Sequence, residues 1–262
     1  MSYWKKEIDN IAQWMREYNE QAGTKGFVIG LSGGIDSAVS ACLAVRAVGK
    51  ENVIGISLPC QTRIDMEDDA KKLAENLDIR LETIRLWESF KYVASDVNRI
   101  FESDNKQLIN ANIKARLRMT ALYGVAGATS FLVAGTGNKS ELDCGYFTKF
   151  GDGGVDLEPL GNYYKTEVYK MAELMPEIPD SIKTKAPSAD LWQGQTDEQE
   201  LGMSYDELDE ILKVFDPNIY TDQTEISADK IDKVYKMIKK AYHKNNMPPR
   251  CPNNNMKRKY YY

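Results

Sequence analysis

Residues 27–37, with the sequence Phe-Val-Ile-Gly-Leu-Ser-Gly-Gly-Ile-Asp-Ser, are typical of a phosphate-binding turn. The apolar start of this segment predicts a buried strand, which leads into a glycine pair and then a helix. Glycines let the backbone approach an anion closely, and the free N–H groups at a helix start point toward that anion. The hydroxyls of Ser32 and Ser37 add two donors. We therefore expect this turn to hold phosphate groups.

Asp36 is unexpected in a turn that binds only phosphate, because a carboxylate repels phosphate. Its presence is explained when a divalent cation lies between the carboxylate and the phosphates. The common nucleotide motifs G-x-x-x-x-G-K-[ST] and G-x-G-x-x-G are both absent from the sequence. An alternative stays open at this stage: the glycine pair makes only a tight strand-to-helix turn, and Asp36 is an N-terminal helix charge.

A second polar group follows the short apolar run 131–134 and has the sequence Gly135-Thr-Gly-Asn-Lys-Ser-Glu141. The two glycines allow a sharp turn that exposes the Thr136 hydroxyl. Glu141 falls at an expected helix start, from which it and Asp36 would supply two carboxylate oxygens to one Mg²⁺. The alternative is that Glu141 is an acid that stabilises the N-terminus of that helix.

The elements that must position these residues alternate between strand and helix patterns. We expect strands over residues 27–31, 53–58, 79–84 and 131–134, and helices over 2–21, 36–48, 65–77, 86–101, 105–125, 204–214 and 228–243. This alternation predicts an α/β fold, a doubly wound parallel sheet with helices on both faces. Ligands in such sheets bind at the carboxyl ends of the strands, which brings both polar groups to one crevice.

The overall composition excludes several classes of protein. The 262 residues carry a net charge of −5, with a pI near 5.2, whereas general nucleic-acid binders are usually basic. Four widely spaced cysteines and one histidine do not form a zinc pattern. No apolar run approaches the ~20 residues that span a bilayer. We expect a cytoplasmic protein with reduced cysteines and no nucleic-acid or membrane partner.

We expect residues 1–262 to form a single domain, since no repeat or obvious break interrupts the pattern. The helix over 2–21 carries one aromatic and aliphatic stripe that packs on its own domain or meets a second subunit; its members are Trp4, Ile8, Ile11, Trp14, Met15 and Tyr18. The tail at about 253–262 is expected to be flexible and solvated.

Two polar segments, 145–154 and 183–202, are long for plain connections. We expect them to be binding loops or lids that close over a reaction intermediate and exclude water. The alternative is ordinary surface loop.

The motif at 32–37 resembles the signature of the ATP pyrophosphatases, or PP-loop family, which cleave ATP between its α- and β-phosphates. Over residues 30–244 the chain resembles the ammonia-dependent NAD⁺ synthetases, which amidate deamido-NAD⁺. The further motifs that carry this resemblance lie in family order: Asn112–Met119, Gly135–Asn138 with Glu141, Gly145–Asp156, Lys165, Lys185–Leu191, Asp197–Gly202 and His243-Lys244. The resemblance implies a fold of the adenine nucleotide α-hydrolase-like, PP-loop type.

The resemblance also implies a role for each matched residue. It implies that Asp36, Glu141 and Lys165 are catalytic, and that Asp36 and Glu141 hold Mg²⁺. It implies that ATP, the co-substrate, binds Gly30, Leu31, Ser32, Gly33, Gly34, Ile35, Asp36, Ser37, Thr136, Lys165 and Ser188. It implies that deamido-NAD⁺ binds Arg116, Lys149, Asp156, His243 and Lys244. The family often has threonine in place of Ser188, and both residues carry a hydroxyl.

The implied reaction has two steps. The nicotinate carboxylate attacks the α-phosphorus of ATP, and ammonia then attacks the acyl-adenylate and expels AMP. Mg²⁺ and Lys165 would stabilise the charge on the phosphates. An acidic protein must supply local Arg and Lys to bind the dinucleotide pyrophosphate and carboxylate.

The resemblance further implies a homodimer with the dinucleotide site near the subunit interface. Because the matched region fills the chain, we expect ammonia rather than glutamine as the nitrogen donor. Other PP-loop ligases remain alternatives, such as a GMP synthetase, an argininosuccinate synthetase or a tRNA-thiolating enzyme. A nucleotide sensor that binds ATP without cleaving it is an alternative from another class.

Overall fold

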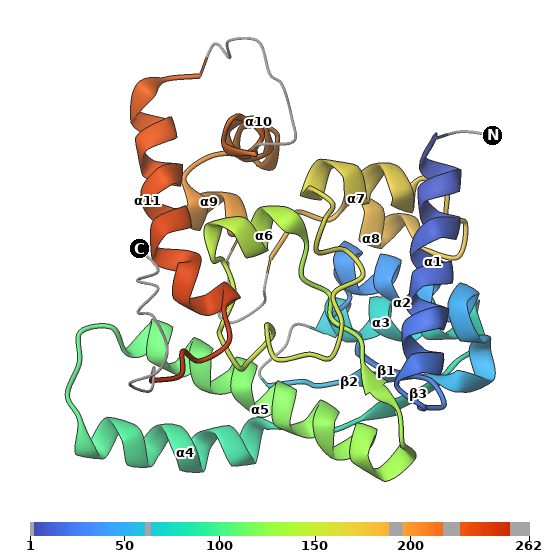
Figure 1. The fold of residues 1–262 in the computed structure, drawn as a ribbon. Helices are drawn as coiled ribbons and strands as arrows, with labels where there is room; N and C mark the ends of the chain where they lie inside the picture. The colour runs from blue at the N-terminus through green and yellow to red at the C-terminus, as the bar shows by residue number, and fades with distance from the viewer. Residues whose placement is uncertain (1–2, 61–63, 189–195, 217–225, 252–262) are drawn as a thin grey trace.

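A computed structural model describes residues 3–60, 64–188, 196–216 and 226–251 (Figure 1). Within these ranges, four parallel strands form one sheet in the order β3-β2-β1-β4. The strands are β1 (Phe27–Gly30), β2 (Val53–Ser57), β3 (Arg80–Thr83) and β4 (Leu132–Val133). Each lies inside a predicted strand and is somewhat shorter than predicted. The expected parallel α/β sheet is confirmed.

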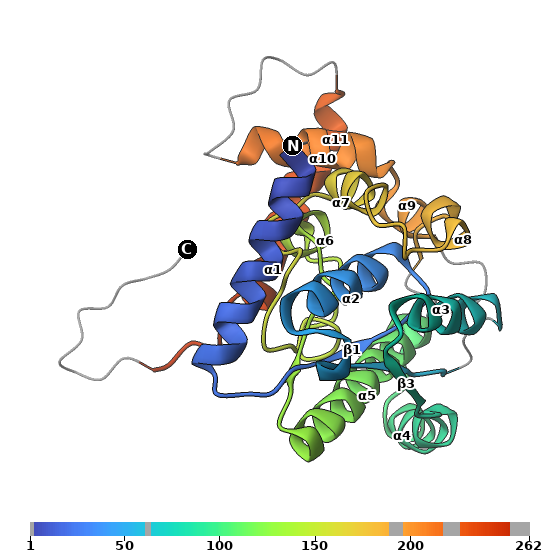
Figure 2. The ribbon, with the colours of Figure 1, turned by 90° about the vertical axis from the view of Figure 1, so that its right-hand side faces the viewer.

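Alternate residues of β1 point to opposite faces of the sheet, and helices cover both faces. Phe27 and Ile29 belong to an apolar cluster with helices on one side, whereas Val28 belongs to a second cluster on the other side. The first cluster joins α1 (Tyr3–Gln21), α2 (Ile35–Val48) and α3 (Ile64–Leu77). The second joins α4 (Trp87–Ile100) and α5 (Lys106–Thr129). Figure 2 shows these two helical layers above and below the strands. The expected doubly wound arrangement is therefore confirmed.

The second half of the chain adds mostly short helices beyond the carboxyl ends of the strands (Figure 1). They are α6 (Lys139–Cys144), α7 (Lys165–Ala172), α8 (Asp180–Thr184), α9 (Asp197–Leu201), α10 (Tyr205–Phe215) and α11 (Ala228–Asn245). A third apolar cluster, which includes Cys144, Leu208 and Val234, joins α6, α10 and α11. This small core holds α11 against α6, the helix that carries Glu141.

The segment 183–202, expected to be a lid or binding loop, has helical residues at both ends, because α8 ends at Thr184 and α9 covers Asp197–Leu201. Thr196 accepts a hydrogen bond from the Gln199 N–H and so caps α9, and Gly202, with a φ of 70°, ends it. Residues 189–195 of this segment, and the predicted tail at 253–262, lie outside the described residues.

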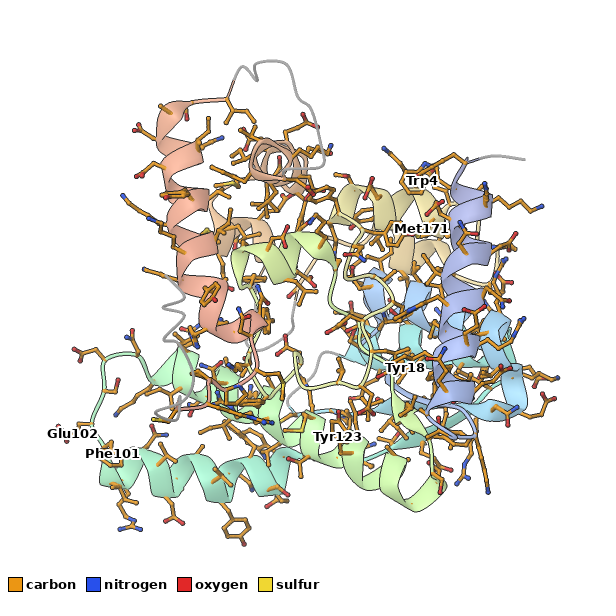
Figure 3. The ribbon with its side chains drawn as sticks, in the orientation of Figure 1. Trp4, Tyr18, Phe101, Glu102, Tyr123 and Met171 are labelled. Carbon is orange, nitrogen blue, oxygen red and sulfur yellow. The ribbon has the colours of Figure 1, made fainter. Side chains whose placement is uncertain are left out.

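The predicted N-terminal helix is confirmed as α1. The residues of its predicted stripe differ in burial, however. Ile8, Ile11 and Met15 are buried in the first cluster. Trp14 and Tyr18 are 43% and 37% exposed. Figure 3 shows Tyr18 on α1, and its hydroxyl donates to the main-chain oxygen of Asp156 at 3.2 Å. The periodicity of the sequence thus predicted correctly which side of α1 is buried. Trp14 and Tyr18 lie at the edge of that side. Among the helices described, none is both long and apolar enough to cross a bilayer.

Candidate active site

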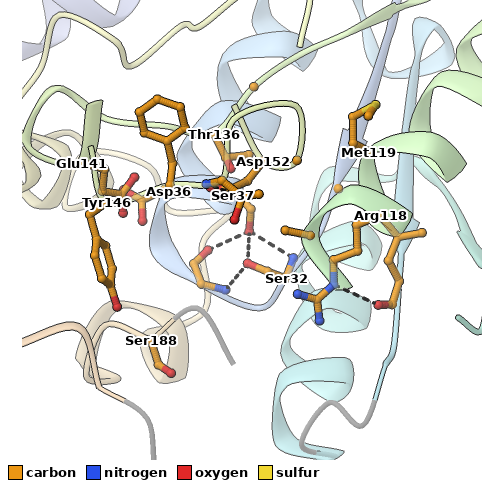
Figure 4. Close-up of a pocket in the computed structure, with 18 of the residues that line it drawn as sticks. Ser32, Asp36, Ser37, Arg118, Met119, Thr136, Glu141, Tyr146, Asp152 and Ser188 are labelled. Atoms are coloured by element: carbon orange, nitrogen blue, oxygen red, sulfur yellow. Dashed lines mark hydrogen bonds between the residues drawn. The ribbon is translucent and has the colours of Figure 1, made fainter. Parts of the chain in front are cut away.

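A cavity of about 620 Å³ lies at the carboxyl ends of the strands (Figure 4). Parallel strands bring Leu31, Ser57 and Ala134 to the same edge of the sheet, and all three line the cavity. The predicted site residues that also line it are Gly30, Ser32, Gly34, Ile35, Asp36, Ser37, Arg116, Thr136, Glu141, Lys149, Lys165, Ser188, His243 and Lys244. Gly33 and Asp156 are the two predicted residues that do not.

The turn after β1 has the geometry of an anion cradle. Gly34 is the N-cap of α2, so the first N–H groups of that helix open toward the cavity. The Ser37 hydroxyl donates to the Gly34 carbonyl at 2.9 Å and lies 3.1 Å from the Ser32 hydroxyl (Figure 4). Gly33 faces away from the cavity: its φ is 77°, and a Cβ there would lie 2.4 Å from the Met66 carbonyl oxygen. Gly33 is thus required by packing against α3.

The turn after β4 is supported from behind by Glu158, a residue that the sequence motifs did not single out. The Gly137 N–H donates to Glu158 Oε2 at 3.1 Å. A Cβ on Gly135 would lie 2.2 Å from the same oxygen, so a larger residue there would displace the Glu158 carboxyl. Burial raises the pKa of Glu158 to about 8. This carboxyl therefore holds the backbone on either side of Thr136, which lines the cavity.

The two predicted metal-binding acids lie together, and Asn138 holds both. The Asn138 side-chain amide donates to Asp36 Oδ1 at 2.9 Å. The Asn138 main-chain N–H donates to Glu141 Oε2 at 3.2 Å, and its side-chain oxygen accepts from the Glu141 N–H at 3.0 Å. This reciprocal pair is the capping box of α6. The N-terminal-acid interpretation of Glu141 is therefore correct, and the same carboxylate also faces the cavity.

Lys165 completes the group. Its Nζ lies 2.5 Å from Asp36 Oδ2 and 3.9 Å from Glu141 Oε1, and the side chain is 2% exposed. Burial lowers the pKa of Lys165, but the charges of Asp36, Glu141 and Asp197 outweigh burial and raise it overall. Burial raises the pKa of Glu141, as does the charge of Asp36, while Lys165 opposes both. We call Asp36, Asn138, Glu141 and Lys165 the acid end of the cavity.

The backbone at Lys165 is fixed by two residues that the sequence did not reveal as part of the site. The Lys165 N–H donates to Ser140 Oγ at 2.8 Å, and the Ser140 hydroxyl donates in turn to Asp209. Asp209 Oδ2 accepts from the Thr166 N–H at 3.0 Å. Asp209 is a buried acid on the apolar side of α10. An acid among apolar helix positions is unusual, and that position in the sequence could have indicated a structural role. The network ties α6 and α7 to α10.

Asp197 forms a second acidic wall beside the acid end. It is 4% exposed, and it accepts hydroxyl hydrogen bonds from Tyr205 at 3.0 Å and Tyr146 at 3.3 Å. The Tyr205 ring lies 5.1 Å from the Lys165 ammonium, within cation–π range. Burial raises the pKa of Asp197, and the charge of Lys165 opposes this. The resemblance marked Asp197 only as part of a motif.

The predicted dinucleotide-binding cations gather at a different part of the same cavity. We call Arg116, Lys149, His243 and Lys244 the basic end. The Lys244 ammonium donates to the carbonyls of Gly145 and Phe147, both at 2.7 Å. The Lys149 ammonium donates to the carbonyl of His243, in the last turn of α11, and to that of its C-cap Asn246, the latter at 2.8 Å. Arg116 donates to the Lys149 carbonyl at 3.3 Å. These cations join α5, the glycine-rich segment and α11.

Asp156 is separated from the basic end. Its carboxylate accepts from the Val133 N–H at 2.8 Å and from the Tyr123 hydroxyl at 3.1 Å. It lines a neighbouring cavity of about 350 Å³ that shares Phe147, Val155 and Lys244 with the larger one. The structure therefore places Asp156 at the junction of β4 and α5.

The oxygen atoms at the acid end supply some, but not all, of the ligands that a hard divalent cation needs. Asp36 Oδ2 and Glu141 Oε1 are carboxylate oxygens, the ligands that Mg²⁺ prefers, and both face the same ammonium. Two protein ligands suffice for Mg²⁺ where a triphosphate and water supply the rest. Among the described residues, no group of three or more His, Cys, Asp or Glu side chains gathers to hold a metal alone. The arrangement suits a cation that arrives with a phosphate ligand.

The chain is similar to known proteins over most of its length. The model of the NAD synthase family matches residues 7–248. The NH(3)-dependent NAD(+) synthetase of Methanosarcina mazei is 44% identical over 249 residues, covering 92% of this chain and 95% of that protein. The corresponding protein of Carboxydothermus hydrogenoformans is 42% identical, covering 94% and 96%. The solved NMN synthetase from Francisella tularensis has a TM-score of 0.86 at 35% identity, covering 97% of this chain and all of that one.

Proposed function

Because the chain belongs to the NAD synthase family, we propose that it is an ATP-dependent ligase that amidates deamido-NAD⁺ to NAD⁺ and releases AMP and pyrophosphate. One observation carries this proposal. A chain 44% identical to an NH(3)-dependent NAD(+) synthetase presents a phosphate turn, an acid pair and a basic cluster around one cavity. Family membership favours this reaction over that of a GMP synthetase or another PP-loop ligase.

In the first step the nicotinate carboxylate oxygen attacks the α-phosphorus of ATP, and the bond to the β-phosphate oxygen breaks. The products are an acyl-adenylate and pyrophosphate. The N–H groups at the start of α2 and the Ser32 hydroxyl bind the phosphates, and Ser37 turns its hydroxyl from the Gly34 carbonyl to join them. The Lys165 ammonium stabilises negative charge that develops on them. Thr136 and Ser188 line the same cavity and contribute hydroxyls toward ATP.

In the second step ammonia attacks the activated carbonyl carbon. AMP leaves with the electron pair of the carbon–oxygen bond, and the ammonium nitrogen loses a proton to give the carboxamide. No covalent bond to the protein is required. Ammonia as donor is supported by the NH(3)-dependent relatives, which this chain matches over nearly their whole length.

Asp36 and Glu141 would hold Mg²⁺ through Oδ2 and Oε1. When bound there, Mg²⁺ supplies positive charge beside the triphosphate. Arg116, Lys149, His243 and Lys244 would bind the anionic groups of deamido-NAD⁺, because they line one part of the cavity. Asp156 would contact the dinucleotide from the neighbouring cavity and position β4 through Val133.

We also infer a homodimer with the acceptor site close to the interface. Support comes from apolar side chains on α4 and α5, where Tyr92 is 74% exposed, Phe101 70% and Leu108 58%. Three cysteines are buried as free thiols, which suits a cytoplasmic enzyme working on ATP. We keep the proposal of a single domain over residues 1–262.

A second acceptor is favoured by one observation, the TM-score of 0.86 to an NMN synthetase. That likeness makes the smaller nicotinate mononucleotide a candidate substrate for the same chemistry. The dinucleotide remains our first proposal, because the NH(3)-dependent NAD(+) synthetases are the more similar in sequence.

The test is to incubate the protein with ATP, Mg²⁺, ammonium and either acceptor, and to follow AMP and the amidated product. We expect one AMP per NAD⁺ and a higher kcat/KM for deamido-NAD⁺ than for nicotinate mononucleotide. A reversed preference would make the chain an NMN synthetase. ATP binding without turnover of either acceptor would favour the sensor alternative.

A further inference from the structure

Asn138 presets the two carboxylates of the acid end. It is fully buried, and it occupies one oxygen of each acid, Asp36 Oδ1 through its side chain and Glu141 Oε2 through its main chain. The remaining oxygens, Asp36 Oδ2 and Glu141 Oε1, are directed at the Lys165 ammonium. Two carboxylates are thus oriented toward one cation by a residue that itself carries no charge.

The cation between the two acids is the side chain of Lys165. The Lys165 backbone is anchored to Ser140, so the side chain reaches the acids from a fixed origin. The ammonium lies 2.5 Å from one acid and 3.9 Å from the other, and it is almost completely shielded from water. Both carboxylates are only partly exposed, and this one ammonium lies opposite the free oxygen of each.

We propose that Lys165 is an internal counter-ion that occupies the place of the divalent cation in the nucleotide-free enzyme. The divalent cation then enters only when a triphosphate is present to accept the displaced ammonium. Moving a buried ammonium away from its acids without a new anion leaves an uncompensated charge, which is strongly unfavourable. Binding of metal and binding of ATP are therefore coupled through one side chain. This inference rests on the proposed role of Asp36 and Glu141 as metal ligands.

The surroundings of Lys165 limit where the displaced ammonium can go. The Tyr205 ring lies 5.1 Å from the ammonium, and the Tyr205 hydroxyl donates to Asp197, which lines the cavity. Lys165 also lines the cavity into which the phosphate turn opens. The ammonium can turn from the acids toward phosphate while Asp197 and Tyr205 keep it from leaving the site. Asn138 keeps the acids in place during the exchange.

The experiment measures Mn²⁺ binding to nucleotide-free protein, from the electron paramagnetic resonance signal of free Mn²⁺. Lys165→Met and Lys165→Gln should bind Mn²⁺ at least about tenfold more tightly than the unmodified protein, because the competing cation is gone. The double variant Asp36→Asn with Lys165→Met should lose this gain. Lys170→Met removes the same charge from the same helix and serves as the matched control, with unchanged Mn²⁺ binding.

Equal Mn²⁺ affinity in the unmodified protein and both folded Lys165 variants would overturn the inference. If neither variant folds, the unmodified protein gives the test: without nucleotide, millimolar Mn²⁺ should not raise its Tm. A rise in Tm that disappears in Asp36→Asn would show a ready metal site and contradict the inference. These measurements need no turnover, so they separate this inference from the proposed reaction. Absent NAD⁺ formation with tight Mn²⁺ binding by Lys165→Met would reject only the reaction.

Discussion

The two ends of the cavity satisfy their charges in different ways. At the acid end, Asp36 and Glu141 both face Lys165, and both accept a hydrogen bond from Asn138, the N-cap of α6. At the basic end, the ammonium groups of Lys149 and Lys244 are held by main-chain carbonyls. One end is a group of acids that share one lysine, and the other is a set of lysines that hold segments of backbone together.

This difference predicts different consequences of substitution. Removing an acid changes the charge available for chemistry, while the helices that carry it stay capped and packed. Removing a lysine of the basic end frees carbonyls that hold α11 to the glycine-rich segment, so folding and ligand binding should change together. Substitutions at the two ends, each with a matched control, test that contrast.

Asp36→Asn should lower kcat/KM for ATP by about 10³-fold, since a ligand of the proposed metal is lost. The asparagine oxygen can still accept from Asn138, so the helices stay packed, but the buried Lys165 ammonium loses its nearer carboxylate and we expect a lower Tm. Steady-state AMP formation and a melting curve measure both effects. Asp96→Asn, which alters an exposed ion pair on α4, is the control and should leave both unchanged. Near-normal turnover in Asp36→Asn would remove this residue from the metal site.

Glu141→Gln should lower kcat by about 10²-fold and raise the Mg²⁺ concentration needed for half-maximal rate. The amide oxygen can keep the capping box with Asn138, which isolates the loss of charge. Glu207→Gln is the matched control, because Glu207 closes the same kind of capping box on α10, away from the cavity. An equal Mg²⁺ requirement in all three proteins would reject a metal-binding role for Glu141.

Lys244→Met should combine a stability loss of about 1–3 kcal/mol with a several-fold higher KM for deamido-NAD⁺. Two carbonyls, those of Gly145 and Phe147, lose their donor, and the cavity loses a cation. Denaturant unfolding and acceptor titration measure the two effects. Lys240 lies one turn earlier on an exposed part of α11, so Lys240→Met is the control and should change neither the stability nor the KM. A KM effect without a stability effect would contradict the backbone-holding role described for the basic end.

Glu158→Gln should alter the pH dependence of stability rather than the reaction. Burial raises the pKa of Glu158 from an ordinary 4.5 to about 8, so the folded state binds a proton that the unfolded state releases between these values. Folding therefore loses stability through this group as the pH rises from about 4.5 to 8. The variant should gain Tm relative to the unmodified protein over that range, by about 3 °C or more at pH 8. A difference that does not depend on pH would contradict the raised pKa.

The sequence predicted the sheet and the acid end well, because the information there is local. Strand periodicity and the glycine turn at 32–37 fixed where β1 ends and α2 begins. Glu141 follows its own strand within a few residues, and parallel strands bring both acids to one edge. Family resemblance then added Lys165, which periodicity alone could not distinguish from a helix start.

The supporting residues were missed because their roles depend on packing between distant segments. Asp209 reaches Ser140 across 69 positions of sequence, and Asp197 reaches the site through Tyr205. Glu158 is recognisable only once the Gly135 turn is folded over it. The donation of Lys149 and Lys244 to carbonyls was also beyond sequence reasoning, since it depends on where α11 ends.

The central claim is that the cavity joins the acceptor carboxylate to the α-phosphorus of ATP. Deamido-NAD⁺ labelled with ¹⁸O in its nicotinate carboxylate tests this directly, with mass spectrometry of the AMP that is released. Our account predicts one carboxylate ¹⁸O in each AMP, because that oxygen stays with phosphorus when ammonia displaces the adenylate. AMP without ¹⁸O, formed alongside NAD⁺, would contradict it.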